Sequence, residues 1–238
     1  MNDSEQHADF RKRQLGLEFP ILPRCTLATF EAGPNVEIVA ALAAPGDDRF
    51  RALWLAGEAG AGKSHLLQGA CHAAMARGAL AAYLPAALPD AAPDMLDGLE
   101  SYRLVAIDDV ERRLGDADWE TALMALYQQL YERSATLVLA ASVAPFDLTI
   151  GLADLASRLR SFEVHRLAPL DDDDRERVMQ RWAASRGLTF GSDALPFLLR
   201  RLPRRMDVLW AAFERLDTAA LAQQRRLTIP LVKEILEL

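Results

Sequence analysis

The sequence predicts an α/β domain, in which helices flank a parallel sheet, followed by an all-helical domain. Between residues 25 and 166, short apolar runs alternate with stretches of helical periodicity, a pattern typical of strand–helix–strand units. A glycine-rich motif joins the first apolar run to the helical stretch after it, and beyond Pro169 only helical stretches remain. These observations predict a flexible tail at residues 1–22, an α/β domain at 23–167 and a helical domain at 168–238.

The expected strands are short apolar runs, rich in Leu, Val and Ala. Their alternation with helical stretches, at this spacing, implies that they form a parallel sheet covered by helices. The runs are residues 52–56, 80–84, 103–107, 136–141 and a shorter one at 162–165.

Two helices are expected between these strands. Residues 63–77 have helical periodicity and are followed by Gly78, a common helix stop. Asp118 is expected to cap the second helix, because an apolar stripe of helical spacing follows it. The residues of that stripe are Trp119, Leu123, Leu126 and Leu130.

The second domain is expected to be built from helices alone. The acidic residues 171–174 open the first helix, at 175–186, where negative charge suits the helix dipole. Thr228 is placed to cap the last helix, with Pro230 in its first turn. The helical stretches between them are 195–202 and 206–224.

The composition excludes several classes of protein. The chain has 238 residues, of which 51% are hydrophobic, and its formal net charge of −7 argues against a general nucleic-acid-binding protein. Cys25 and Cys71 have no metal-ligand spacing and favour a reducing compartment. No apolar run reaches the roughly 18 residues of a membrane span, and the N-terminus is unlike a signal peptide. A cytoplasmic protein without membrane contact is therefore expected.

Residues 57–64 read GEAGAGKS and fit the phosphate-loop pattern G-x-x-x-x-G-K-[ST]. The motif follows an expected strand and opens an expected helix, so that backbone N–H groups would point at a bound phosphate. The lysine would reach the β- and γ-phosphates of ADP or ATP, and the serine would hold Mg²⁺. The alternative is a glycine-rich turn before a helix. The residues expected to bind nucleotide are Gly57, Gly60, Gly62, Lys63 and Ser64.

Two carboxylates follow the strand expected at residues 103–107. Asp108 would hold Mg²⁺ at the strand tip, and Asp109 would lie nearer the attacking water. Many related ATPases have Glu at the second position, and the shorter Asp puts its reach as a base in doubt. The alternative is a pair of exposed aspartates in a turn.

The tail contains the stretch Gln14-Leu15-Gly16-Leu17-Glu18-Phe19. In an extended backbone its three apolar side chains, those of Leu15, Leu17 and Phe19, would lie on one side. They could be buried by a partner or by the protein's own domain, as an edge strand.

These motifs, together with the helical second domain, resemble the AAA+ proteins, and more closely the DnaA/Hda family of replication-initiation proteins. Four further stretches carry the resemblance over almost the whole chain. They are residues 29–35, similar to the segment that passes near the adenine, 155–159, similar to Box VII, 202–206, similar to sensor 2, and 228–236, similar to the family's C-terminal ending.

The resemblance implies roles for four more residues. Arg158 would be an arginine finger acting on a neighbour's nucleotide, and Arg204 would act in cis from the helical lid. Asn35 would lie near the adenine. Ser142 is the only polar candidate at the sensor 1 strand tip and departs from the family pattern there. Each arginine could instead be an ordinary surface charge.

The resemblance also implies partners. The tail is similar to the Q-L-x-L-x-[LF] peptide that binds the DNA polymerase sliding clamp, with Gln14 in a polar pocket. Leu17 and Phe19 would enter the apolar pocket, and Leu15 would cover its edge. The free energy gained by burying three such groups is reduced by the cost of ordering the peptide. The expected affinity is therefore weak, on the order of micromolar or worse.

The function that the resemblance implies is a nucleotide-bound, clamp-associated regulator that stimulates ATP hydrolysis on DnaA and limits re-initiation. It would activate a partner's ATPase more than its own. DNA would be contacted only indirectly or weakly, and pairing into a homodimer is left open. The alternatives are a helicase or transposase loader of the DnaC/IstB kind, for which a 22-residue tail is short, and a stand-alone P-loop ATPase.

Overall fold

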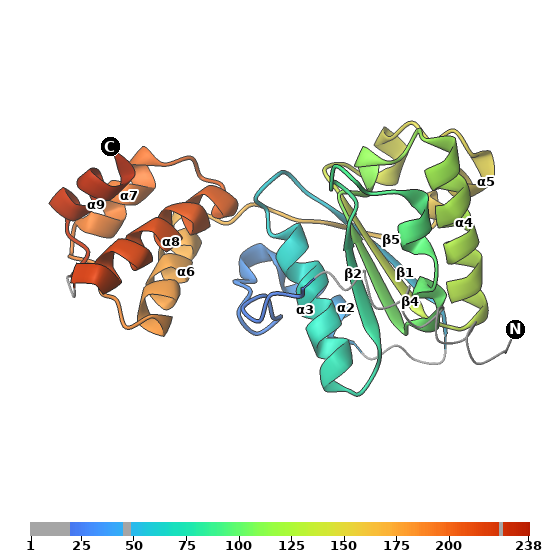
Figure 1. The fold of residues 1–238 in the computed structure, drawn as a ribbon, viewed down its shortest axis with the longest axis horizontal. Helices are drawn as coiled ribbons and strands as arrows, with labels where there is room; N and C mark the ends of the chain where they lie inside the picture. The colour runs from blue at the N-terminus through green and yellow to red at the C-terminus, as the bar shows by residue number, and fades with distance from the viewer. Residues whose placement is uncertain (1–19, 45–48, 224–225) are drawn as a thin grey trace, which may run out of the picture. The chain divides into compact units, whose positions relative to one another are not determined.

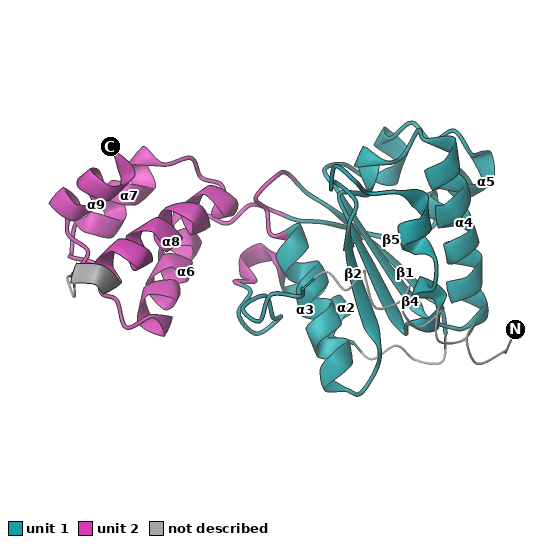
Figure 2. Ribbon diagram, in the orientation of Figure 1, with its two compact units in different colours: residues 1–30, 36–57, 63–167 teal, residues 31–35, 58–62, 168–238 magenta. Residues whose placement is uncertain are grey.

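The computed structural model describes residues 20–44, 49–223 and 226–238, except the side chains of 221–223 (Figure 1). The chain forms two compact units (Figure 2). Unit 1 contains residues 20–30, Val36–Gly57 and Lys63–Leu167, and unit 2 contains Glu31–Asn35, Glu58–Gly62 and Ala168–Leu238. Two short segments from the first part of the chain thus pack with the C-terminal helices.

Unit 1 is built on a five-stranded sheet of order β2-β3-β4-β1-β5, in which every neighbouring pair is parallel. The predicted fold class is confirmed, and each expected strand is present with bounds shifted by one residue at most. The strands are β1 (Arg51–Ala56), β2 (Ala81–Pro85), β3 (Leu104–Asp108), β4 (Thr136–Ala141) and β5 (Glu163–Arg166).

The sheet is buried on both faces, which explains why its central strands read as continuous apolar runs. Alternate residues such as Trp54, Ile107 and Leu139 pack in one core with the apolar stripe of α4 (Ala117–Glu132) and with α5 (Ala153–Arg160). On the other face α3 (Lys63–Ala76) packs against β2 and β3 (Figure 1).

One sequence prediction about the helices of unit 1 is wrong. The cap of α4 is Asp116 and not Asp118, because the Asp116 carboxylate accepts the backbone N–H groups of Asp118 and Trp119. Asp118 therefore lies inside the first turn. The helix α2 (Val36–Ala43) was not predicted, since its eight residues are nearly all Ala and Val or Ile and lack a polar face.

Glu120 fastens α4 to the segment before α5. It is buried, and its carboxylate accepts the backbone N–H groups of Gly115, Gly151 and Leu152 at 2.7, 3.0 and 2.6 Å. Burial alone raises the pKa of Glu120, but these three donors outweigh it and hold the pKa below its usual value. The charged carboxylate is therefore the form that stabilises this corner of unit 1.

We expect Glu120→Gln to lower the free energy of unfolding by about 1–3 kcal/mol at pH 7, because an amide offers one acceptor oxygen instead of two. The folded pKa of Glu120 lies below the unfolded value, so its stabilisation is present above about pH 4.5 and is lost as the pH falls through the folded pKa. Denaturant unfolding at pH 7 and at pH 3.5 measures both effects. The control is Glu132→Gln, at an exposed site on the same helix; equal shifts for the two variants would contradict the assignment.

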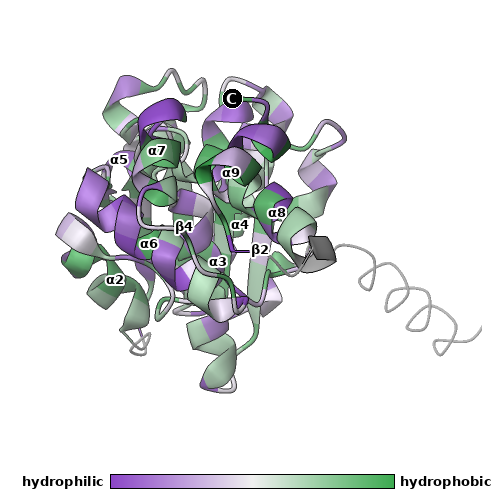
Figure 3. Cartoon of the chain, turned by 90° about the vertical axis from the view of Figure 1, so that its left-hand side faces the viewer, coloured by the Kyte–Doolittle hydropathy of each residue, from purple (hydrophilic) through white to green (hydrophobic). Residues whose placement is uncertain are grey.

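Unit 2 contains the helices expected after Pro169, with a core that includes Leu198, Leu209, Phe213 and Val232. Figure 3 shows hydrophobic and hydrophilic residues along each of them, as expected for helices that bury one face. None of the helices in the described ranges is both long and apolar enough to cross a bilayer. The four helices are α6 (Asp172–Ser185), α7 (Ala194–Arg201), α8 (Met206–Gln223) and α9 (Ile229–Leu236).

The acidic start of α6 and the position of Thr228 just before α9 agree with the prediction. Asp171 precedes α6 and its carboxylate accepts the N–H of Asp174. Thr228 precedes α9 and Pro230 lies in the first turn, but the Thr228 side chain makes no cap hydrogen bond. The proline, with its fixed φ angle, is thus the stronger start signal of this helix.

Candidate nucleotide-binding site

Three of the expected site segments meet at the carboxyl edge of the sheet. In register, Ala56 of β1 pairs with Ala141 of β4, and Ile107 of β3 pairs with Leu139 of β4. The N–H of Gly57 continues this ladder by donating to the carbonyl of Ala141 at 3.1 Å. The residues that directly follow these strands therefore lie side by side, as ligand sites of open parallel sheets require.

The phosphate loop runs from Gly57 to the first residue of α3, Lys63. Gly60 and Gly62 have φ angles of +80° and +98°, in the region that favours glycine. The Lys63 side chain is buried, and its Nζ donates to the carbonyl of Gly57 at 2.6 Å. The loop therefore curls back on itself, with the lysine held inside the turn and the N-terminus of a 14-residue helix at its end.

Asp108 is a buried carboxylate at the tip of β3. Its Oδ2 accepts the hydroxyl of Tyr83 at 2.9 Å, and its Oδ1 accepts the N–H of Asp109 at 3.1 Å. Burial raises the pKa of Asp108, while a hydrogen bond from the Ser64 hydroxyl and the charge of Lys63 act in the opposite direction. The carboxylate thus lies beside both polar side chains that end the phosphate loop.

This donor set fits Mg²⁺. Asp108 and Ser64 supply hard oxygen ligands, and a buried carboxylate whose charge is disfavoured by desolvation gains from a nearby cation. Among the described residues, no group of three or more His, Cys, Asp or Glu side chains forms a metal cage. A magnesium ion here would take its other ligands from phosphate oxygens and water, as it commonly does in nucleotide sites.

Asp109 differs from its neighbour in exposure and backbone. It is half-buried and has a φ of +50°, a left-handed conformation that Asp adopts more readily than most residues. The chain turns here into a short 3₁₀ helix, Val110–Arg112. The two neighbouring carboxylates therefore have different environments: that of Asp108 is buried and hydrogen-bonded, and that of Asp109 is half-buried.

Ser142 is exposed at the end of β4, and its N–H donates to Oε1 of Glu111 at 2.8 Å. The other oxygen of Glu111 is buried and has no hydrogen-bond partner among the described residues. Glu111 thus ties the turn after β3 to the tip of β4. Sequence reasoning missed it because no local pattern connects two residues so far apart in the chain.

Arg158 lies on the outer face of α5, whose inner face is anchored by Leu155 and Leu159. Its side chain is exposed, and its guanidinium carbon lies 5.9 Å from the centroid of the Tyr127 ring. Within the described part of the chain, no carboxylate forms an ion pair with it. An aromatic ring therefore positions the group, and no carboxylate of the described residues compensates its charge.

Arg204 is held by unit 2 itself. Its guanidinium forms an ion pair with Asp172 at 2.9 Å, and its carbonyl accepts the Nε of Arg175 at 3.1 Å. Arg175 also donates to Asp172 at 2.6 Å, so that this carboxylate binds two arginines. With 70% of its side chain exposed, Arg204 is restrained by one contact that is weak in solvent.

Arg205 and Asp207, which follow Arg204 in the chain, bring the start of α8 against Gly60 of the phosphate loop. A Cβ atom at Gly60 would lie 2.6 Å from Oδ1 of Asp207 and 3.0 Å from Cβ of Arg205. Arg205 and Asp207 form a two-pronged ion pair at 3.1 and 2.6 Å, and this hydrogen bonding lowers the pKa of Asp207. Neither residue was expected at the site, because only the structure reveals their contact with the loop.

Asn35 is buried in unit 2, where its side-chain amide exchanges two hydrogen bonds with the backbone of Ala168, at 3.0 and 2.9 Å. Both polar atoms of the amide are thus used by the first residue of the C-terminal segment. The four tail residues expected to bind a clamp, Gln14, Leu15, Leu17 and Phe19, lie outside the described residues.

Comparison with known families adds a match in the helical part of the chain. Residues 172–236 match the family model described as the lid domain of Hda. The match spans α6 to α9, the four helices that form the core of unit 2.

The chain also resembles solved structures. Domain III of the replication initiation protein DnaA from Thermotoga maritima has a TM-score of 0.78 and 20% identity, and the match covers 92% of this chain and 98% of that one. DnaA from Aquifex aeolicus, bound to AMPPCP, has a TM-score of 0.65 and 20% identity, covering 85% and 67%. The RuvB branch-migration motor of Thermotoga maritima has a TM-score of 0.61 and 16% identity, covering 83% and 64%. The fold is therefore that of AAA+ proteins.

Proposed function

We propose, from the premise that the chain is an AAA+ protein of the DnaA/Hda family, that it limits re-initiation of replication by stimulating ATP hydrolysis on DnaA. In this proposal the chain binds ADP or ATP, docks on the DNA polymerase sliding clamp through its tail and presents Arg158 to the nucleotide held by DnaA. DNA is contacted through the clamp and DnaA more than by this chain.

The observation that carries the proposal is the exposed guanidinium of Arg158, with which no carboxylate in the described part of the chain forms an ion pair. An arginine finger must place a positive charge on a neighbour's phosphates, so its charge cannot be used up within its own fold. Packing against Tyr127 limits the conformations of the side chain without neutralising it. The rigid attachment of α5 to the core, through Leu155 and Leu159, supports the same role.

The nucleotide of this chain has a supporting role in the proposal. The phosphate loop and Lys63 would bind the phosphates, and Ser64 with Asp108 would hold Mg²⁺, which neutralises phosphate charge when bound. Asp109 is exposed enough to orient a water, with Ser142 at the neighbouring strand tip. The contact of Arg204 with Asp172 has little strength at this exposure and would not keep the guanidinium from the nucleotide.

The test uses ATP-loaded DnaA, the clamp loaded on DNA and the full chain, with ADP formation as the readout. We expect Gln14→Ala combined with Leu15→Ala to abolish clamp binding and to reduce the stimulated rate about tenfold or more, because the chain is no longer concentrated beside its partner. The control is Glu18→Ala, on the opposite side of an extended tail.

Other outcomes would contradict the proposal. Undiminished stimulation by the Gln14 and Leu15 double variant would exclude the docking role of the tail. Equal ADP formation with and without DnaA, lost in Lys63→Ala, would instead identify a stand-alone ATPase. Capture of a replicative helicase but not of the clamp would favour the loader.

A further inference from the structure

Tyr83 of β2 and Asp108 of β3 bring a hydroxyl and a carboxylate together on one face of the sheet in unit 1. Asp108 pairs in register with Pro85, two residues beyond Tyr83, so the side chains of Tyr83 and Asp108 point to the same side of the sheet. Ile107, the neighbour of Asp108, packs in the core on the side of α4, so the pair lies on the side that α3 covers. The Tyr83 hydroxyl donates to Oδ2 of Asp108 at 2.9 Å, and strand register fixes this contact.

The helix α3 adds two polar side chains to this pair. Ser64 and Gln68 are four residues apart and therefore lie on one side of the helix. Burial and the charge of Asp108 raise the pKa of Tyr83, while hydrogen bonding from Gln68 and Ser64 acts in the opposite direction, which places both side chains beside the hydroxyl. Gln68 is 6% exposed, and its Oε1 accepts the N–H of Leu22 at 2.9 Å. Its amide nitrogen is therefore the group that donates toward Tyr83.

These contacts determine how the Asp108 carboxylate is oriented. Its Oδ1 accepts the N–H of Asp109 at 3.1 Å, and its Oδ2 accepts the Tyr83 hydroxyl. A carboxylate has about four acceptor positions, so others remain for the Ser64 hydroxyl and for a cation. Rotation of the carboxylate would break one or both of the two hydrogen bonds. The Tyr83 hydroxyl therefore helps to fix which acceptor positions face the phosphate loop.

We infer that Tyr83 is a positioning residue, which holds the Asp108 carboxylate in the orientation that binds the Mg²⁺ of a bound nucleotide. The inference rests on the nucleotide binding of the proposed function, to which it adds a residue. Groups that hydrogen-bond to a metal-binding side chain typically account for about 10–100-fold in metal affinity. A carboxylate that can turn away binds a cation less tightly, whereas the phosphate loop contacts the phosphates themselves. Loss of the hydroxyl should therefore weaken the binding of Mg²⁺ and leave Mg²⁺-independent nucleotide binding unchanged.

The test is Tyr83→Phe in the full chain, which removes the hydroxyl and keeps the ring. Mg²⁺ is titrated in a calorimeter into the chain saturated with ADP, and the Kd for ADP is measured separately in EDTA. We expect the apparent Kd for Mg²⁺ to rise about tenfold, because the carboxylate is no longer held, and the Kd for ADP in EDTA to stay the same. A defect of the fold alone would weaken the binding of ADP in EDTA as well.

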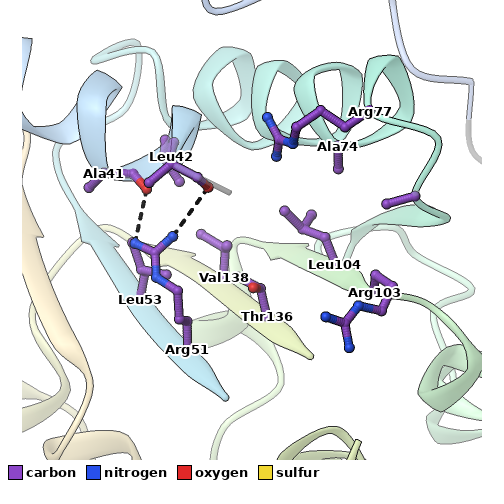
Figure 4. Close-up of a pocket in the computed structure, with 12 residues that line it drawn as sticks. Ala41, Leu42, Arg51, Leu53, Ala74, Arg77, Arg103, Leu104, Thr136 and Val138 are labelled. Atoms are coloured by element: carbon purple, nitrogen blue, oxygen red, sulfur yellow. Dashed lines mark hydrogen bonds between the residues drawn. The ribbon is translucent and has the colours of Figure 1, made fainter. Parts of the chain in front are cut away.

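Two controls remove a hydroxyl elsewhere in unit 1. Tyr131→Phe makes the same chemical change at a residue that is 60% exposed on α4. Thr136→Val removes a hydroxyl from the first residue of β4, which lines a cavity at the amino edge of the same sheet, opposite the phosphate loop (Figure 4). Neither change should alter the apparent Kd for Mg²⁺. Thermal unfolding of each variant checks that it is folded.

A double variant tests whether Tyr83 acts through Asp108. Asp108→Asn removes the charge that the hydroxyl orients, so the addition of Tyr83→Phe should cause little further loss, since effects within one hydrogen-bond network are not additive. An unchanged apparent Kd for Mg²⁺ in Tyr83→Phe, or a further tenfold loss in the double variant, would overturn the inference. Absence of ADP binding to the wild type, with Mg²⁺ and in EDTA, would instead overturn nucleotide binding by this chain, and the inference with it.

Discussion

Arg158→Ala is expected to return the rate of ATP hydrolysis on DnaA to its unstimulated level. Fingers supplied in trans contribute about 10³–10⁵ in rate, so a fall of at least about 10³-fold in the stimulated component is expected. Arg158 is exposed, and the contact that its guanidinium makes among the described residues is with the ring of Tyr127. The substitution should therefore leave the unfolding temperature of this chain nearly unchanged. ADP formation on DnaA and thermal unfolding measure the two effects separately.

The matched control for this experiment is Arg160→Ala. Arg160 is exposed on the same helix, and its guanidinium also lies over an aromatic ring, 5.7 Å from the centroid of Phe146. Both variants therefore lose one surface cation and one cation–π contact. Loss of the stimulated rate with Arg158→Ala but not with Arg160→Ala would support the arginine-finger role. Equal rates for the two variants would contradict it.

Gly60→Ala is expected to weaken nucleotide binding by about 100-fold or more. The φ of +80° disfavours any side chain, and the added Cβ would lie 2.6 Å from Asp207 and 3.0 Å from Arg205. The loop would have to move, and with it the backbone N–H groups that are proposed to bind the phosphates. Titration with a fluorescent ADP analogue measures the change in Kd.

Gly78→Ala separates backbone strain from steric contact. Gly78 has the same φ of +80°, but no atom of the described residues lies within 4 Å of the Cβ that it would gain. The variant should therefore lose some stability at the end of α3 and keep its affinity for nucleotide. If both substitutions left nucleotide binding intact, the loop would not be the phosphate site.

Local sequence signals were sufficient for much of this fold. The central strands β1, β3 and β4 are largely buried apolar runs, and the phosphate loop is a contiguous motif between a strand and a helix, so each could be located without knowledge of its partners. The α4 cap was misplaced by two residues because Asp116 and Asp118 are equally good caps in isolation. The first is the cap because its carboxylate reaches the N–H groups of Asp118 and Trp119.

The parts of the site that could not be predicted are contacts between distant segments. Glu111 meets Ser142 and Asp207 meets Gly60 only because the chain folds, and neither pair shares a motif. Asn35 shows the same limit: the segment was identified by resemblance, but the bond of its amide to Ala168 follows from packing alone. Resemblance indicates which residues matter to a family, whereas their partners in this chain follow from three-dimensional geometry.

The contact between Gly60 and the start of α8 has an evolutionary consequence. Because the carboxylate of Asp207 occupies the volume that any side chain at position 60 would need, the two positions are not free to drift independently. Related proteins with alanine at position 60 should carry a residue smaller than Asp at position 207. A smaller residue at position 207 should likewise tolerate a larger one at position 60. Correlated substitution at positions 60 and 207 among related sequences would therefore be evidence for this contact.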